Sequence, residues 1–178
     1  MRTDCALNVV LIGMPGAGKS TVGVLLAKRL GYHFVDSDLI LQAREGRRLQ
    51  EIIVSDGLPA FMAIEEEILC GLSGTRTVIA TGGSAVYSEP AMQRLKSLGR
   101  LVYIDVPVET LEVRVRDMDT RGVVLDPGES YRDLFQRREP LYRQFADLVV
   151  SGQSRTADEI AHQIEDQVCG DGLLKAEA

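Results

Sequence analysis

The segment from Gly13 to Ser20, with the sequence GMPGAGKS, constrains this chain more than any other stretch. It fills every fixed position of the phosphate-binding pattern G-x-x-x-x-G-K-[ST]. Glycines let the backbone wrap tightly with its N–H groups turned inward, towards the oxygens of a nucleotide triphosphate. Lys19 can reach the β- and γ-phosphates, and the Ser20 hydroxyl can bind Mg²⁺. The residues expected to bind the nucleotide phosphates are Gly13, Gly16, Ala17, Gly18, Lys19, Ser20 and Thr21.

The residues on either side place this loop between a strand and a helix. The apolar run Leu7–Ile12 precedes it, and an amphipathic segment from Val22 to Leu30 follows, ended by Gly31. Such a helix turns the positive end of its dipole towards an anion bound in the loop. A glycine-rich turn without a ligand is the alternative, and the order of strand, loop and helix favours phosphate binding over it.

The composition predicts one acidic globular domain. The chain has 178 residues, 45% of them hydrophobic, and a formal net charge of −6. An acidic surface disfavours nucleic-acid and anionic-membrane partners, because phosphate groups bind basic faces. The scattered cysteines Cys5, Cys70 and Cys169 are typical of reduced thiols in the cytosol. We therefore expect a cytoplasmic monomer with a single domain over residues 1–170 and a frayed tail over 171–178.

Strand-like runs alternate with helical stretches along the whole chain. This βαβ alternation predicts a parallel sheet with helices on both faces. Ligands in such folds bind beyond the carboxyl ends of the strands, so we expect the chemistry in the loops that follow the strands. The last helix opens with the capping box Thr156–Glu159. The expected strands are Leu7–Ile12, His33–Val35, Thr77–Ala80, Arg100–Asp105 and Asp147–Val150.

Two carboxylates, Asp36 and Asp38, follow the second expected strand. Residues i and i+2 of an extended chain project to the same side, so both can face the phosphate loop. One can bind the magnesium shell, and the other can orient an attacking hydroxyl. The alternative is that one of them only caps a helix beginning near Leu39. The need for an acidic partner for the metal favours the functional pair.

The segment Thr81–Ser84, with the sequence TGGS, follows the third expected strand. Paired glycines at the carboxyl end of a strand permit a close approach of the backbone to a ligand. A plain turn is the alternative. The position opposite the phosphate loop favours a substrate contact.

Arginines are dense between Arg114 and Arg143. Most are expected to lie on solvated helix faces, but an enzyme that handles ATP needs some of them to neutralise charge in the transition state. The irregular segment within about 116–130 predicts a lid that closes over the nucleotide and excludes water.

Other polar residues receive structural interpretations. His33 and His162 stand alone, without a base constellation. The run Glu65–Glu67, taken by itself, predicts an exposed helix surface. The tyrosines expected to pack with hydrogen-bonded hydroxyls are Tyr87, Tyr103 and Tyr142.

Taken together, these motifs resemble those of the shikimate kinases, small cytosolic enzymes that move the γ-phosphate of ATP onto the 3-hydroxyl of shikimate. The resemblance covers about Asn8 to Val168 and adds FVDSD, TGG, REPLY and a following AD to the phosphate loop. It implies a P-loop NTPase fold, a three-layer α/β/α sandwich with a five-stranded parallel sheet in the order 2-3-1-4-5. It also implies a lid over about 116–130, a substrate-binding helical segment over about 36–75, ATP and Mg²⁺ as cofactors, and a small hydroxylated substrate.

The resemblance also implies a role for each matching residue. Lys19, Asp38 and Arg121 are similar to the catalytic residues, Arg121 being the lid arginine near the phosphates. Asp36 is similar to the carboxylate on the metal side, together with Ser20, and Arg114 to an arginine that stacks on adenine. The implied substrate side consists of Asp38, Met62, Glu65, Gly82, Gly83, Ser84 and Arg138.

Three positions depart from the family pattern. The family's Phe-Arg-x-x-Glu appears here as FMAIE over residues 61–65, so Met62 replaces a carboxylate-binding arginine. The family's third glycine is Ser84, and Gly122 replaces the proline of the lid. Charged hydrogen bonds are worth roughly 1.5–3 kcal/mol each, so Met62 predicts shikimate binding weaker by about one to two orders of magnitude. Arg47 or Arg48 is a candidate replacement for the missing arginine.

Three functions remain open at this stage. The first is a kinase of shikimate. The second is a related kinase for another small hydroxylated metabolite, neutral or amine-bearing, because Met62 leaves Glu65 without a cationic neighbour. The third is a nucleotide-binding protein without catalysis, which the intact Lys19, Ser20, Asp36 and Asp38 disfavour. A nucleoside monophosphate kinase fits the TGGS and REPLY segments poorly.

Overall fold

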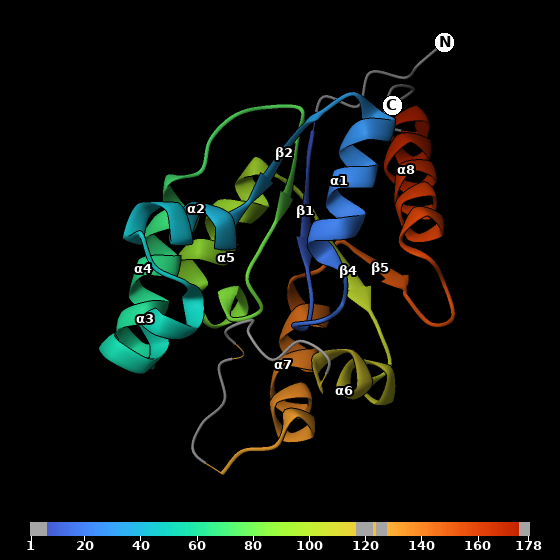
Figure 1. Ribbon diagram of the computed structural model, residues 1–178. Coiled ribbons are helices and arrows are strands. Elements are labelled where there is room, and N and C mark those ends of the chain that lie inside the picture. Colours follow the sequence, from blue (N-terminus) through green and yellow to red (C-terminus); the bar gives the residue numbers. More distant parts are fainter. Residues whose placement is uncertain (1–6, 117–122, 124–127, 175–178) are drawn as a thin grey trace.

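A computed structural model describes residues 7–116, 123 and 128–174 of the chain (Figure 1). Five parallel strands form one sheet in the order β2-β3-β1-β4-β5. The expected fold class and strand order are confirmed, and each strand lies within one residue of its predicted bounds. The strands are β1 (Asn8–Ile12), β2 (His33–Asp36), β3 (Thr77–Ala80), β4 (Gly99–Asp105) and β5 (Leu148–Ser151).

Strand β1 lies at the centre of the sheet, and its carboxyl end lies at the edge where such folds bind ligands. Its residue Val10 pairs with Ile79 of β3 on one side and with Leu101 of β4 on the other. All five residues of β1 are buried, as expected for a parallel strand covered on both faces. Because the strands are parallel, the loops that follow β1, β2 and β3 meet at one edge of the sheet.

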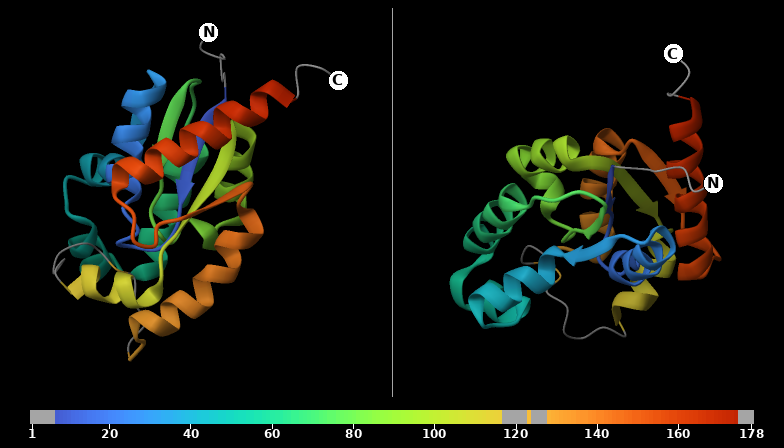
Figure 2. Two further views of the ribbon diagram at one scale, coloured as in Figure 1. Left: turned by 90° about the vertical axis from the view of Figure 1, so that its right-hand side faces the viewer. Right: turned by 90° about the horizontal axis from the view of Figure 1, so that it is seen from above.

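Helices cover both faces of this sheet. Helices α1 and α8 lie side by side on one face, and α5 and α7 lie on the other, as Figure 2 shows. No helix within the described ranges 7–116 and 128–174 is long and apolar enough to cross a bilayer. The helices are α1 (Lys19–Leu30), α2 (Ser37–Glu45), α3 (Leu49–Asp56), α4 (Leu58–Gly71), the short 3-10 helix η1 (Ala85–Tyr87), α5 (Glu89–Leu98), α6 (Val108–Arg116), α7 (Tyr131–Phe145) and α8 (Ala157–Leu174).

Helix α8 begins where the capping box placed it but ends later than expected. Its cap is reciprocal, because the Glu159 N–H donates to Thr156 Oγ1 at 3.3 Å and the Thr156 N–H donates to Glu159 Oε2 at 2.7 Å. The helix then continues to Leu174, into the segment 171–178 where we expected a frayed tail. The expected lid joins α6 to α7, and its residues 117–122 and 124–127 lie outside the described part of the chain.

Helices α2, α3 and α4 form a small unit beside the sheet with an apolar cluster of its own. Leu41, Ile52, Phe61 and Ile68 are its buried members. The main core is separate and surrounds the sheet. Two cores indicate that the α2–α4 unit has its own packing, and surface contacts must help to fix how its three helices lie together.

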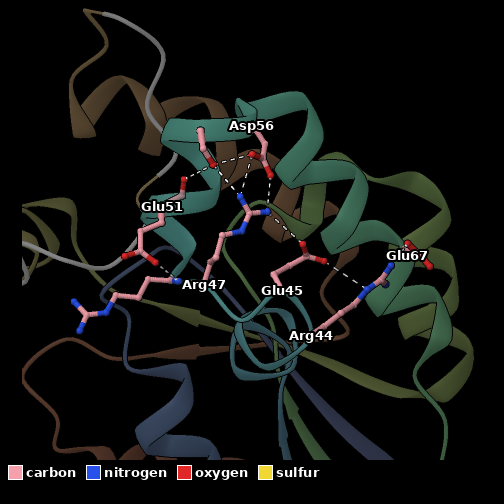
Figure 3. A network of polar contacts seen from close by, with 8 residues as sticks. Arg44, Glu45, Arg47, Glu51, Asp56 and Glu67 are labelled. Atoms are coloured by element: carbon pink, nitrogen blue, oxygen red, sulfur yellow. Dashed lines mark hydrogen bonds and ion pairs between the residues drawn. The ribbon is translucent and has the colours of Figure 1, made fainter.

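A network of ion pairs makes these surface contacts (Figure 3). The Arg47 guanidinium, just after α2, donates to Asp56 at 2.6 Å and to Glu45 at 3.4 Å. Arg44 donates to Glu67 of α4 at 2.8 Å. Hydrogen bonds from Arg47 hold the pKa of Asp56 at about 2. Arg47 is therefore engaged within this network, and neither Arg47 nor Arg48 lines the cavity described below.

We predict that Arg47→Met lowers the melting temperature of the protein and that this decrease is smaller at high salt. The melting temperature should fall by about 1–3 °C at low ionic strength, because two carboxylates lose their partner. The deficit should shrink in 1 M NaCl, where surface charges are screened. Arg48→Met is the matched control: the Arg48 contact in the network is its backbone N–H, which donates to Glu51.

The ion pair between Arg47 and Asp56 stabilises the fold in a pH-dependent way. The folded-state pKa of Asp56 is depressed, so the pair stabilises the fold above the ordinary pKa of 3.8, and that stabilisation is lost as the pH falls towards about 2. Thermal melts of the two variants should therefore converge over this interval. Equal melting temperatures for Arg47→Met and Arg48→Met at low salt and neutral pH would contradict the role of the network.

Candidate active site

The phosphate loop connects β1 to α1, as the sequence predicted. Its glycines Gly13, Gly16 and Gly18 all have positive φ values, of 146°, 83° and 90°. Tyr131, the first residue of α7, donates its hydroxyl hydrogen to the Pro15 carbonyl at 2.5 Å. The loop is therefore held by a side chain of α7 as well as by its own turn.

Lys19 lies beneath the loop as the first residue of α1. Its ammonium donates to the carbonyl oxygens of Gly13 at 2.7 Å and Met14 at 3.0 Å. Burial lowers the pKa of Lys19 to about 8, although the nearby charge of Asp38 opposes the shift. An ammonium that is desolvated to this degree gains strongly from an anion placed beside it.

The structure places the two aspartates differently. Asp36 caps α2, because its Oδ1 accepts the backbone N–H groups of Asp38 at 3.0 Å and Leu39 at 3.4 Å. The chain turns into α2 at Ser37, so the extended geometry that predicted a matched pair does not apply. Asp38 lines the cavity and Asp36 does not. Both charges nevertheless act on Lys19 and oppose the lowering of its pKa.

Glu65 is buried against the loop that follows β3. Ser84 donates its hydroxyl hydrogen to Glu65 Oε2 at 2.5 Å, while Oε1 has no hydrogen-bond partner among the described residues. Burial raises the pKa of Glu65 to about 7. The Glu65–Glu67 run alone had predicted an exposed helix surface, which is wrong for Glu65, at 4% exposure, and right for Glu67. A charge run on one helix does not reveal which member faces a neighbouring loop.

Gly82 lets the backbone pass close to both carboxylates. A Cβ added to Gly82 would overlap Glu65 Oε1 and lie 2.8 Å from Asp38 Oδ1. The Gly82 N–H donates to Ser37 Oγ at 3.1 Å, which ties the loop to the start of α2. A larger residue at position 82 would therefore displace at least one of the two acidic side chains.

Arg138 is almost completely buried in α7, with 1% of its surface exposed. Its Nε donates to the Tyr87 hydroxyl at 3.1 Å, and its guanidinium carbon lies 5.0 Å from the centre of the Tyr87 ring. Nη2 of Arg138 has no hydrogen-bond partner among the described residues. The hydroxyl of Tyr142, from the next turn of α7, donates to the Gly83 carbonyl at 2.7 Å. The expected packing of these tyrosines, with Tyr103 bonded to Asp105, is confirmed.

One cavity of about 510 Å³ joins these groups to the phosphate loop. Gly13 lies just outside its lining and contributes the carbonyl that binds Lys19. Met62 does not line it either and packs against the apolar cluster of the α2–α4 unit. Arg121 lies outside the described residues. The expected site residues that line the cavity are Gly16, Ala17, Gly18, Lys19, Ser20, Thr21, Asp38, Glu65, Gly82, Gly83, Ser84, Arg114 and Arg138.

The sequence analysis missed several lining residues. Arg155 and Ala157 reach the cavity from the segment between β5 and the start of α8, and Phe61 lines it from α4. Arg114 donates to the Gly16 carbonyl at 3.3 Å, which places it at the phosphate-loop end. Arg155 could have been found, because it follows a strand at the ligand-binding edge of the sheet. Phe61 had no such signal, because an apolar residue in an amphipathic helix reads as core.

Three arginines of the arginine-dense stretch, Arg132, Arg137 and Arg143, form surface ion pairs, as expected for most of its members. Arg132 pairs with Glu109 and Glu112, and Arg137 pairs with Glu129. Arg143 pairs with Asp105 and Glu139. His33 and His162 are exposed and lie away from the cavity lining.

Comparison with known proteins identifies one family. The family model for shikimate kinase matches residues 15–169. The chain is 38% identical to the shikimate kinase of Synechococcus sp. (strain RCC307), over 95% of this chain and 87% of that protein. It is 40% identical to the shikimate kinase of Pseudomonas entomophila, over 83% and 88% of the two chains.

Solved structures agree with these matches. The shikimate kinase of Acinetobacter baumannii in complex with shikimate superposes with a TM-score of 0.86 at 34% identity, covering 93% of this chain and 94% of that one. The shikimate kinase of Aquifex aeolicus superposes with a TM-score of 0.81 at 34% identity, covering 94% and 99%. A gluconokinase from Sinorhizobium meliloti, at 17% identity and a TM-score of 0.53, shares the fold alone.

We predict that nucleotide binding takes up a proton at alkaline pH. Because the pKa of Lys19 is about 8 before an anion arrives, part of this lysine is neutral at about pH 8.5. A bound triphosphate favours the charged form, so MgATP binding should take up about 0.5–1 proton at this pH and almost none at about pH 6.5. Calorimetry in buffers of different ionisation enthalpy measures this number.

The matched variant is Lys19→Arg, whose charge is permanent, so binding should then proceed without proton uptake. Lys28→Met, on the exposed side of the same helix, should behave as the unmodified protein. Unchanged uptake in Lys19→Arg at about pH 8.5 would show that another group titrates.

Proposed function

Because the chain belongs to the shikimate kinase family, we propose that it is a kinase that transfers the γ-phosphate of ATP to the 3-hydroxyl of shikimate. The observation that carries the proposal is the single cavity that joins the phosphate loop to Asp38, Glu65 and Arg138. Phosphoryl transfer needs donor and acceptor in line and in contact, which a continuous cavity permits.

The nucleotide half of the cavity supplies charge neutralisation. Lys19 and the loop N–H groups bind the β- and γ-phosphates, and Arg114 lies beside the loop. Ser20 and Asp36 are the residues that would hold Mg²⁺. A hydroxyl and one carboxylate fit this ion, which keeps several waters and takes further oxygens from the phosphates. When bound, Mg²⁺ neutralises charge on the phosphate oxygens. The contribution of Arg121 stays a prediction.

Asp38 is the residue we assign to the acceptor hydroxyl. It lies in the cavity within reach of the charge of Lys19, so it sits where the donor and acceptor halves meet. A carboxylate in this position accepts a hydrogen bond from the attacking hydroxyl and orients its lone pair for in-line attack. Asp38 therefore acts on the reacting atoms, whereas Asp36 supports the turn from which Asp38 projects.

Arg138 and Glu65 supply the recognition of the acceptor. The buried Arg138 Nη2 is a charged donor that suits a carboxylate, and the buried Glu65 Oε1 is an acceptor that suits a hydroxyl. A small polyhydroxylated carboxylic acid presents both groups. This complementarity supports shikimate as the acceptor.

A related acceptor is the second candidate, because Met62 packs against the apolar cluster outside the cavity lining and offers the acceptor carboxylate no charge. A methionine in place of an arginine removes one carboxylate contact, and Glu65 can pair with an ammonium as well as with a hydroxyl. A screen of shikimate beside neutral and amine-bearing analogues decides between the two.

We also infer that the protein acts as a cytoplasmic monomer and does not bind nucleic acid. Its net charge of −6 supports the absence of nucleic-acid binding. Size-exclusion chromatography with light scattering tests the oligomeric state.

We predict that the protein releases ADP in proportion to added shikimate and that Asp38→Asn lowers kcat by about 10²–10⁴-fold. ATP affinity should change little, because Asp38 acts on the acceptor. A coupled ADP assay gives kcat and KM, and mass spectrometry detects the phosphorylated product. Asp166→Asn, at an exposed position of α8, is the control and should keep full activity. ADP release no faster with millimolar shikimate than without it would reject this acceptor.

A further inference from the structure

The turn after β3 contacts both buried charges on the acceptor side of the cavity. Ser84, just before η1, bonds to Glu65, and Tyr87, the last residue of η1, bonds to Arg138. Ser84 lines the cavity, whereas Tyr87 lies behind Arg138 and does not. One short segment of backbone therefore sets the position of two side chains that come from different helices.

Tyr87 holds the guanidinium of Arg138 in two ways. Its hydroxyl accepts the Nε hydrogen at 3.1 Å, and its ring faces the guanidinium carbon at 5.0 Å. A planar group held at one edge and one face is restrained, so the direction of Nη2 is set. Nη2 is buried without a hydrogen-bond partner among the described residues, and Arg138 is one of the residues that line the cavity. A buried charged donor without a partner is costly, so this donor favours an anionic group bound beside Arg138.

Ser84 holds the carboxylate of Glu65 by one hydrogen bond. The bond from the Ser84 hydroxyl to Oε2 leaves Oε1, which faces Gly82, as the oxygen without a hydrogen-bond partner among the described residues. The charged groups that act on Glu65 are Asp38, Arg138 and Lys19. An oxygen held in place presents its lone pairs in set directions, which makes it selective for the position of a donor on the ligand.

We propose that Ser84 and Tyr87 are positioning residues that set acceptor specificity. Tyr87 holds Arg138 so that this one guanidinium reads the carboxylate of the acceptor, and Ser84 holds Glu65 so that one oxygen reads a ring hydroxyl. This inference rests on the proposed function. It explains how one buried arginine, Arg138, can bind the acceptor carboxylate although Met62 provides no charge.

The test for Tyr87 separates recognition of the carboxylate from folding. In Tyr87→Phe the ring remains and the hydrogen bond is lost, so KM for shikimate should rise about tenfold. In Tyr87→Leu both contacts are lost, and the rise should be larger. The inhibition constant of shikimate carboxamide, which lacks the anion, should change less than about twofold, as should KM for ATP. If Tyr87→Leu does not fold, Tyr87→Phe carries the test alone.

Tyr32→Phe is the matched control, because Arg76 lies 5.5 Å from the Tyr32 ring, away from the cavity lining. It should leave every constant unchanged. Equal changes for shikimate and its carboxamide in Tyr87→Phe would overturn the proposal, because a loss of folding weakens both alike. An unchanged KM for shikimate would overturn it as well.

The test for Ser84 uses acceptors that lack a hydroxyl. Ser84→Ala should raise KM for shikimate about tenfold. The inhibition constants of the 4-deoxy and 5-deoxy analogues of shikimate are then compared. The analogue that lacks the hydroxyl bound by Glu65 should keep its inhibition constant in Ser84→Ala, and the other should not. Ser88→Ala is the matched control, since Ser88 bonds to Glu66 at 2.6 Å outside the cavity lining. Parallel increases for shikimate and both analogues would overturn the role of Ser84.

Failure of this inference differs from failure of the proposed function. If the unmodified protein phosphorylates shikimate and the variants match it, the positioning roles are wrong and the function stands. If the unmodified protein shows no shikimate-dependent release of ADP, the proposed acceptor is wrong. In that second case the same variants are tested with the acceptor that the screen identifies.

Discussion

Desolvation of charge is the constraint on which this structure depends. Lys19, Glu65 and Arg138 are all buried, with exposures of 9%, 4% and 1%, and Asp38 stands beside them in the same cavity. Isolated buried charges are costly, and they persist only where opposite charges and hydrogen bonds offset the loss of water. Each of the three buried groups has such support: loop carbonyls for Lys19, Ser84 for Glu65, and Tyr87 for Arg138.

The fold brings these groups together because neighbouring parallel strands end at one edge. Strands β2, β3 and β1 are adjacent in the sheet, so the turn to Asp38, the Gly82–Ser84 loop and the phosphate loop are also adjacent. Helices α4 and α7 then add Glu65 and Arg138 from two sides. The α2–α4 unit carries its own apolar cluster and ion pairs, so it can hold Asp38 and Glu65 in a fixed relation to one another.

Much of this arrangement could be predicted from the sequence. The phosphate loop has a fixed spacing, and alternating apolar runs mark strands, so β1, α1 and the parallel sheet followed from pattern alone. The strand order and the substrate side required the family resemblance. The extended i and i+2 geometry predicted for Asp36 and Asp38 was wrong, because α2 begins at Ser37 and the Asp36 side chain accepts backbone N–H groups at its start. The pattern failed at Glu65 because helix periodicity does not tell which side of a polar run meets a loop. Tyr87 was predicted to pack, but its partner comes from α7, far along the chain.

The most direct test of the account is a crystal structure of the protein with shikimate and a non-hydrolysable ATP analogue. The account predicts that Arg138 Nη2 contacts the acceptor carboxylate, that Glu65 Oε1 accepts from a ring hydroxyl, and that the 3-hydroxyl lies between Asp38 and the terminal phosphate. Shikimate bound elsewhere, or bound in the cavity with its carboxylate turned away from Arg138, would contradict it.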